Sequence, residues 1–335
     1  MSIYNVNGTI LDMAYDINGE IMDAIYDVNG TLIFSPEIIE GYPIENVPTY
    51  TRPRTLEVAE ELDALDSDWQ SFVFVTDPHY PTNKMHSQAV ALYLLSNTSC
   101  SYIFLGGDYC EGNWNESRYR TFVADFKNSI NRRFIHALIG NHELFASEGA
   151  KASSLNNVYN DFLSIKTGLH GDLANDYYYF DNEGTKTRYV VLNTSDASYT
   201  TVSETQLSWV EQAVQLPDST WSVVVITHIP VEQLGDSANS QALINAIKTC
   251  NGSIVGNISG HDHVDALKKI DDSFYRLTLM CDRFEDDQSY APPREVGTIT
   301  ENAVTVVSFN TKTKQVVARR IGAGLNNQIQ YSYAV

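Results

Sequence analysis

From about residue 69 onward, short apolar runs alternate with segments whose apolar residues recur at helical spacing. The apolar runs, rich in β-branched residues, are SFVFVTD, SYIFLGGD, RFIHALIGN, TRYVVLNT, WSVVVITH and GSIVGNISG. The segments between them include HSQAVALYLLSN, YRTFVADFKNSI, ETQLSWVEQAV and SQALINAIKTC. Such alternation predicts an α/β domain with buried sheets. Near the end, AVTVVSFN and KQVVARRIG, joined by TKTK, predict an antiparallel pair of strands.

The N-terminal region has a different pattern. YNVNG at 4–8, YDING at 15–19 and YDVNG at 26–30 recur with a period of 11 residues. Asn-Gly is a strong signal for a tight hairpin turn, because both positions tolerate positive φ. Residues 1–34 are therefore predicted to form a segment of β-hairpin-like repeats. Because such units bury little surface alone, we expect residues 1–34 to pack on the main domain, on a partner or assembly, or on copies of themselves.

Three further boundaries follow from the pattern. Residues 35–68 are proline-rich at first and then include LEVAEELDAL, which has helical spacing, so they predict a linker and a leading helix. Residues 69–322 form the main domain. Residues 323–335 are a polar C-terminal tail for which no regular structure is predicted.

Composition restricts the partners. The chain has 335 residues, 43% of them hydrophobic, and a net charge of −20. A field of that sign repels long polyanions, so we expect no binding of duplex nucleic acid. No apolar run reaches the ~20 residues that span a bilayer, so we expect no membrane partner. The start, MSIYNVNGTI, lacks the features of a secretion signal, and no cysteines form a CxxC pair. These features predict the cytoplasm, with a phage particle or a cell surface as alternatives.

Polar clusters follow five of the predicted strands. They are Asp77-Pro78-His79, Gly106-Gly107-Asp108 with Glu111, Gly140-Asn141-His142-Glu143, Thr227-His228 and Gly260-His261-Asp262-His263. Ligand sites in α/β folds gather beyond the carboxyl ends of strands, so we expect the five clusters to converge in one crevice.

The residue types in these clusters indicate metal chemistry. Carboxylate, imidazole and amide oxygen suit divalent Mn, Fe, Zn or Ni. The donors are too many for one ion, which predicts two divalent ions that share a carboxylate. Asp108, presented by a Gly-Gly turn, is the candidate for the shared ligand. Each cluster alone has an ordinary interpretation as a turn, a helix cap or a core histidine, and only their combination favours a metal site.

In this order, the motifs D-x-H, G-D-x-x-E, G-N-H-E, T-H and G-H-x-H resemble those of the calcineurin-like metallophosphoesterase superfamily. The resemblance covers residues 69 to about 322. ETQLSWVEQAV is similar to the helix that follows the middle strand in many members, and RRIGAG at 319–324 to the closing segment of some bacterial ones. The resemblance implies a four-layer α/β/β/α sandwich, two mixed sheets packed together with helices outside.

The resemblance also implies a role for each motif residue. The implied ligands are Asp77, His79, Asp108 and His263 for one ion, and Asp108, Asn141, His228 and His261 for the other. Asp108 would bridge the ions. His142 would bind no metal and would contact the phosphoryl group or protonate the leaving group, so His142 and Asp108 are the candidate catalytic residues.

Some positions depart from related enzymes. Glu111 stands where purple acid phosphatases carry a metal-binding tyrosine, which argues against that subfamily. Glu143 stands where many members have Asp and is expected to support a ligand from behind. Asp262 would orient an imidazole or face solvent. The motifs contain no obvious arginine of the kind found in Ser/Thr protein phosphatases.

The sequence thus predicts metal-dependent hydrolysis of a phosphomonoester or phosphodiester, with a small phosphoester as the expected substrate. One alternative is a phosphodiesterase or nuclease acting on a polymer, such as nucleic acid or a cell-wall phosphate polymer, in a phage or surface assembly. Another is a binding or assembly protein with a residual metal site. Metal analysis and hydrolysis of p-nitrophenyl phosphate esters separate the last alternative from the other two.

Overall fold

The computed structural model describes residues 25–26, 32–34, 41–80, 86–144, 148–270, 272–283, 294–324 and 328–333. The chain divides into two compact units, Met1–Glu40 and Gly41–Val335. In the first unit, β1 (Ile25–Tyr26) and β2 (Leu32–Phe34) pair antiparallel across the third Asn-Gly repeat. The first two repeats lie outside the described residues, so the repeat segment and its self-association stay predictions.

The second unit contains a six-stranded mixed sheet with the order β15-β14-β13-β3-β4-β5. Its strands are β3 (Trp69–Val75), β4 (Cys100–Leu105), β5 (Ile135–Ala137), β13 (Ala303–Asn310), β14 (Gln315–Gly322) and β15 (Gln328–Ser332). β3, β4 and β5 run parallel. β13 and β14 form the predicted antiparallel pair, and β13 lies antiparallel to β3.

A seven-stranded mixed sheet has the order β11-β12-β10-β9-β8-β7-β6. Its strands are β6 (His170–Asp172), β7 (Tyr177–Asn182), β8 (Thr187–Leu192), β9 (Ser222–Thr227), β10 (Ser253–Ser259), β11 (Ala266–Ile270) and β12 (Phe274–Thr278). The central strands β8, β9, β10 and β12 run parallel. These strands are buried on both faces, as their continuous β-branched runs predict.

Helices cover the outer faces of both sheets. The described helices are α1 (Arg52–Asp63), α2 (Ser87–Asn97), α3 (Glu116–Asn128), α4 (Asn141–Leu144), α5 (Glu148–Val158), α6 (Glu204–Ala213) and α7 (Ser237–Lys248), of which the short α4 lies at the end of β5. Short turns of other helix types are η1 (Ile44–Asn46), η2 (Ile130–Phe134), η3 (Tyr159–Leu163) and η4 (Leu173–Asn175). No helix among the described residues is both long and apolar enough to cross a membrane.

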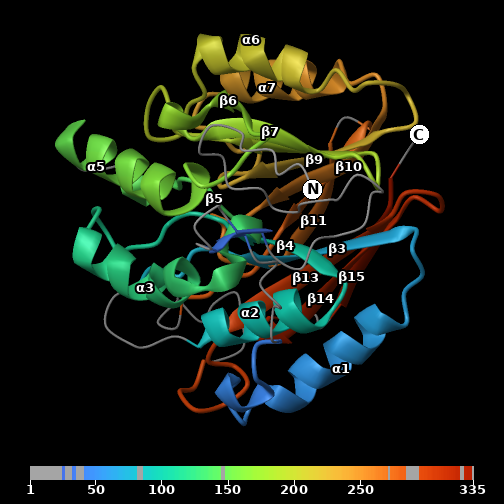
Figure 1. Ribbon diagram of the computed structural model, residues 1–335. Helices are drawn as coiled ribbons and strands as arrows, with labels where there is room; N and C mark the ends of the chain where they lie inside the picture. The colour runs from blue at the N-terminus through green and yellow to red at the C-terminus, as the bar shows by residue number, and fades with distance from the viewer. Residues whose placement is uncertain are drawn as a thin grey trace. The chain divides into compact units, whose positions relative to one another are not determined.

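The layers follow from the packing of alternate side chains. Phe72 of β3 and Phe104 of β4 share one core with Tyr189 of β8, so the two sheets pack face to face. On the opposite face of the larger sheet, Val190 and Val223 join a second core with α6 and α7. Figure 1 shows α6 and α7 above this sheet, with α1 and α2 below the other. The order helix, sheet, sheet, helix is the predicted four-layer sandwich.

Two segments outside the predicted main domain add to it. α1 begins at Arg52, four residues before the predicted helix, with a proline in its first turn where no N–H partner is needed. In the C-terminal segment, for which no regular structure was predicted, β15 pairs with β14 at the edge of the smaller sheet. Tyr331 stabilises this strand, because its ring packs on Tyr275 and its hydroxyl donates to the Val255 carbonyl at 3.1 Å.

Candidate metal centre

The five polar clusters come from two groups of neighbouring parallel strands. β3, β4 and β5 end just before Asp77, Asp108 and Asn141, respectively. β9 and β10 of the other sheet end just before His228 and His261. Parallel neighbours end at the same edge of a sheet, and the two sheets are packed together, so all five ends face one region. The predicted crevice is therefore built by both sheets.

Direct contacts join the two edges. The His228 Nδ1 atom lies 2.8 Å from the carbonyl oxygen of Gly106, which follows β4. The His261 N–H donates to Asp77 Oδ2 at 2.9 Å, and the Thr76 hydroxyl donates to the same oxygen at 2.6 Å. These hydrogen bonds fix the Asp77 carboxylate between the two sheets.

The backbone of the site is in an unusual conformation. Five predicted ligands have positive φ, between 40° and 72°: Asp77, His79, Asp108, His261 and His263. Non-glycine residues seldom adopt this left-handed region, although Asp and His tolerate it better than most. Residues held in such conformations cluster at functional sites, where the surrounding structure over-determines them. Here each sharp turn lets a side chain leave the strand end and point back into the crevice.

Glu143 organises the turns after β4 and β5. Its carboxylate accepts backbone N–H groups from Asp108 and Tyr109, both at 2.8 Å, and from Gly140 at 2.9 Å. The two turns also touch at Gly107, where an added Cβ would lie 2.5 Å from the Gly140 nitrogen. Glu143 thus ties together the backbone of the two turns, and only glycine fits at position 107.

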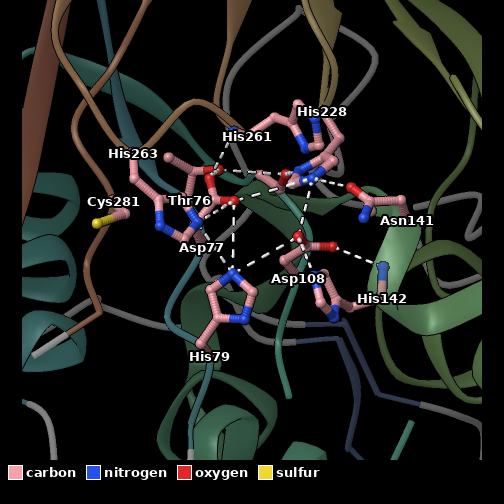
Figure 2. Close-up of polar contacts among 12 residues, drawn as sticks. Thr76, Asp77, His79, Asp108, Asn141, His142, His228, His261, His263 and Cys281 are labelled. Carbon is pink, nitrogen blue, oxygen red and sulfur yellow. Dashed lines mark hydrogen bonds and ion pairs between the residues drawn. The ribbon is translucent and has the colours of Figure 1, made fainter. Parts of the chain in front are cut away.

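Asp77, His79 and His263 form the first group of potential metal ligands. The His79 and His263 Nε2 atoms lie 3.0 Å apart, and the His263 Nε2 atom lies 3.4 Å from Asp77 Oδ1. Figure 2 shows the three side chains converging from different segments. The two imidazole nitrogens and the carboxylate oxygen can therefore bind one cation together.

Asp108, His228 and His261 form a second group. The His228 Nε2 atom lies 3.1 Å from Asp108 Oδ2 and 2.9 Å from Asn141 Oδ1, so the amide oxygen faces the same point. The His79 Nε2 atom of the first group lies 3.6 Å from Asp108 Oδ2. Asp108 therefore lies between the two groups, as Figure 2 shows.

The donor atoms fit divalent cations. Asp77 Oδ1 is buried and has no hydrogen-bond partner among the described residues, although Nε2 atoms of three histidines lie 3.4 to 3.9 Å away. A buried carboxylate oxygen left in this state is costly unless it binds a cation. Imidazole, carboxylate and amide oxygen together match Mn, Fe, Zn or Ni. The orphaned oxygen and the donor types agree with a metal site.

The charges of the site are strongly coupled. Burial would raise the pKa of Asp77, but His228 and His263 outweigh it and hold that pKa well below its usual range. Burial lowers the pKa of His79 to about 4. For His228, burial would also lower the pKa, yet Asp108 and Asp77 raise it to about 9. Burial and the nearby Asp108 raise the pKa of Glu143 to about 8. The charged forms of the buried Asp77 and Asp108 are therefore stabilised by positive charge nearby.

His142 lies at the open side of the two groups. Its side chain is 27% exposed, and its Nε2 atom lies 3.8 Å from Asp108 Oδ2. Its Nδ1 atom lies 2.8 Å from the Gly112 carbonyl oxygen, so Nδ1 carries a proton and donates there. The Nε2 atom is thereby directed toward the space beside Asp108. His228 has a similar arrangement, with its Nδ1 atom at the Gly106 carbonyl, but it is fully buried, whereas the exposure of His142 leaves it accessible to a substrate.

Two predicted supporting residues pair with arginines. Glu111 pairs with Arg283, its Oε1 atom 3.2 Å from the Arg283 Nη2 atom. Asp262 approaches Arg276, with its Oδ2 atom 3.5 Å from the Arg276 Nη1 atom. A third group of potential metal ligands among the described residues consists of His79, Asp108 and His142, and neither Glu111 nor Asp262 belongs to any of the three groups. Of the three supporting residues, Glu143 is the one whose carboxylate accepts a backbone N–H of a candidate ligand.

Three residues at the site escape sequence reasoning. Thr76 binds the Asp77 carboxylate. Tyr199, in the loop between β8 and α6, is 41% exposed and its hydroxyl faces the Asn141 amide. Arg283 lies beyond the last motif. Thr76 could have been found from its place between a strand end and a ligand, whereas a loop tyrosine and an isolated arginine carry no such signal.

Two packed sheets with imidazoles and carboxylates at their strand ends are typical of metal-dependent phosphoester hydrolases. A family model described as calcineurin-like phosphoesterase matches residues 70–265, more than half of the chain. The chain belongs to this family. A comparison with curated protein sequences finds no significant match.

Solved structures share the fold. A dimetal phosphatase from Danio rerio has a TM-score of 0.56 and 15% sequence identity, with 79% of this chain and 99% of that chain covered. A purple acid phosphatase from yellow lupin (Lupinus luteus) seeds has a TM-score of 0.51 and 12% identity, with 80% and 54% covered. At these identities, the likeness shows the fold alone.

Proposed function

We propose that this chain is a metal-dependent phosphoesterase that binds two divalent ions and hydrolyses a small phosphomonoester or phosphodiester. The observation that carries the proposal is the position of Asp108, whose Oδ2 atom lies 3.1 Å from the His228 Nε2 atom and 3.6 Å from the His79 Nε2 atom. A carboxylate between two sets of imidazoles is the arrangement that a shared ligand requires. The family supports the phosphoester substrate class.

The candidate ligands fall into two sets, one for each proposed ion, with Asp108 between them. Asp77, His79 and His263 would hold one ion, with Asn141, His228 and His261 at the other. When bound, the ions would supply Lewis acidity toward the phosphoryl oxygens and acidify water.

In the proposed reaction, His142 contacts the substrate and transfers a proton. With Nδ1–H donated to Gly112, its Nε2 atom accepts a proton or, in the imidazolium form, protonates the leaving oxygen. Hydrogen bonding to Gly112 holds the ring in the orientation for this transfer.

Replacing Asp108 by alanine tests the proposal. We expect the metal content to fall from two ions per chain and hydrolysis of p-nitrophenyl phosphate and bis(p-nitrophenyl) phosphate to drop by about 10³-fold or more, because both ions lose a ligand. Elemental analysis and initial rates with added Mn²⁺ measure the two effects.

A control is Asp262→Ala, which removes a carboxylate that lies between His261 and His263 in the sequence but belongs to none of the groups of potential metal ligands among the described residues. We expect it to keep two ions and to lose less than about threefold in rate. Wild-type turnover by the Asp108→Ala variant would refute the assignment. Digestion of DNA or cell-wall polymer faster than either nitrophenyl ester would favour the polymer alternative.

A further inference from the structure

Arg283 lies in the segment after β12, next to a residue that contacts the strand end before Asp77. The preceding residue, Asp282, donates its backbone N–H to the Thr76 carbonyl at 2.8 Å, directly before the candidate ligand Asp77. The Arg283 side chain is 25% exposed, and its Nη2 atom lies 3.2 Å from Glu111 Oε1. Both its backbone and its side chain are therefore fixed to segments that carry the site.

The partner of Arg283 joins it to His142. Glu111 directly precedes Gly112, whose carbonyl oxygen lies 2.8 Å from the His142 Nδ1 atom. Consecutive Cα atoms are only about 3.8 Å apart, so the guanidinium and the imidazole contact neighbouring residues of one loop. A group bound beside His142 is thus within reach of an arginine side chain.

The guanidinium retains binding capacity in this arrangement. It has five N–H donors in a planar fork, and the ion pair with Glu111 engages one of its terminal nitrogens. In a chain with a net charge of −20, an arginine at this place offsets the negative potential that an anionic substrate would meet.

We propose that Arg283 binds the non-reacting oxygens of a doubly charged phosphomonoester, with Glu111 holding the guanidinium ready and being displaced by the substrate. This inference rests on the proposed function. A phosphomonoester carries almost two negative charges above pH 7, whereas a diester carries one. Arginine recognises such oxygens in a bidentate manner, so it favours the monoester over the diester.

The main experiment compares Arg283→Ala with the wild type on p-nitrophenyl phosphate and bis(p-nitrophenyl) phosphate at pH 8 with Mn²⁺. We expect KM for the monoester to rise about tenfold, with kcat and the diester kinetics changed less than about threefold. Arg283→Lys retains the charge but not the fork and should recover part of the loss. Lys312→Ala is the control. Lys312 lies in the turn after β13 and pairs with Asp68, which precedes β3, so it is at the end of the sheet opposite to the candidate metal centre.

Glu111→Gln separates substrate binding from a purely structural role. Both Glu111→Gln and Arg283→Ala break the same ion pair. If Arg283 only braces the loop, the two variants should impair the enzyme alike. If Arg283 binds the phosphoryl oxygens, Glu111→Gln removes a competing anion and should lower KM for the monoester by about two- to threefold.

Binding of inorganic phosphate and dimethyl phosphate, measured by calorimetry, gives a readout without catalysis. Arg283→Ala should weaken phosphate binding about tenfold and leave dimethyl phosphate nearly unchanged. Equal losses for both anions, or none, would overturn the role of Arg283 while leaving the proposed function intact if the wild type still hydrolyses the esters. A wild type that binds metal and phosphate but hydrolyses neither ester would instead refute the proposed function.

Discussion

Two buried histidines, His136 in the core between the sheets and His228 at the metal centre, differ in their surroundings. The His136 ring stacks on Phe180 at 4.1 Å and lies 5.4 Å from Phe104. Burial lowers its pKa well below the usual value, and Lys166 adds to the effect. The His228 Nε2 atom instead lies 3.1 Å from Asp108 Oδ2. The two carboxylates near His228 reverse the effect of burial on its pKa.

The difference shows that burial alone does not decide the charge of an imidazole. A buried carboxylate near the ring stabilises the positive form, whereas an aromatic surrounding leaves the ring neutral. At the candidate metal centre, the proton on His228 offsets the negative charge of Asp108 and Asp77. Binding a divalent ion there requires the neutral imidazole and therefore releases the proton. The aromatic core has no such demand.

Replacing each histidine by phenylalanine should produce the largest contrast. His228→Phe removes a candidate ligand and leaves Asp77 and Asp108 with less positive charge, so we expect phosphoesterase activity to fall by about 10³-fold or more. His136→Phe puts another ring into an aromatic cluster and should keep activity within about twofold. Initial rates and metal content measured on both variants test the contrast. Equal losses would show that the two environments do not differ in function.

A smaller effect is expected from Thr76→Val, which removes only the hydroxyl that binds Asp77 Oδ2 at 2.6 Å. Residues that orient a ligand typically contribute 10- to 100-fold to metal affinity, so Mn²⁺ binding should weaken within that range. Calorimetric titration of the metal-free protein measures it. Thr305→Val is the matched control, because the Thr305 hydroxyl is buried without a hydrogen-bond partner among the described residues. Unchanged affinity in Thr76→Val would show that Asp77 needs no such support.

The mildest effect concerns acid stability. The folded state keeps His136 neutral, while the unfolded chain takes up a proton as the pH falls through about 6.5. The contribution of neutral His136 to the free energy of unfolding is therefore fully present above pH 6.5. It decreases below that pH, by at most about 2 kcal/mol at pH 5. Denaturant unfolding of the wild type and His136→Phe should show a difference in stability that changes in favour of the variant between pH 7 and pH 5. A constant difference would contradict a neutral His136.

Much of the fold was accessible from the pattern of apolar residues. The six central apolar runs all contain strands, and the four quoted helical segments all contain helices, because continuous burial and helical periodicity leave distinct signals. β15 was missed, since an edge strand with polar side chains carries little of that signal. The α5 helix, Glu148–Val158, was also missed, and its low amphipathicity gives the physical reason.

The candidate ligands could be named because each lies within four residues of a strand end, in motifs that resemble those of a known family. Their contacts could not, since they depend on which sheet each strand joins. β3 and β9 belong to different sheets, yet His228 lies 3.8 Å from the Asp77 carboxylate. Likewise, the pairing of Glu111 with Arg283 joins positions far apart in sequence, and nothing local in either segment indicates it.

By itself the sequence determined the strands and helices, the metal-binding residue types and their order, because these depend on neighbouring residues and on side-chain chemistry. The tertiary structure alone decided that Asp108 lies between two imidazole groups, that Glu143 accepts its backbone N–H, and that Arg283 pairs with Glu111. The physical reason is that packing two sheets face to face sets distances of a few ångströms between segments that local sequence preferences leave independent.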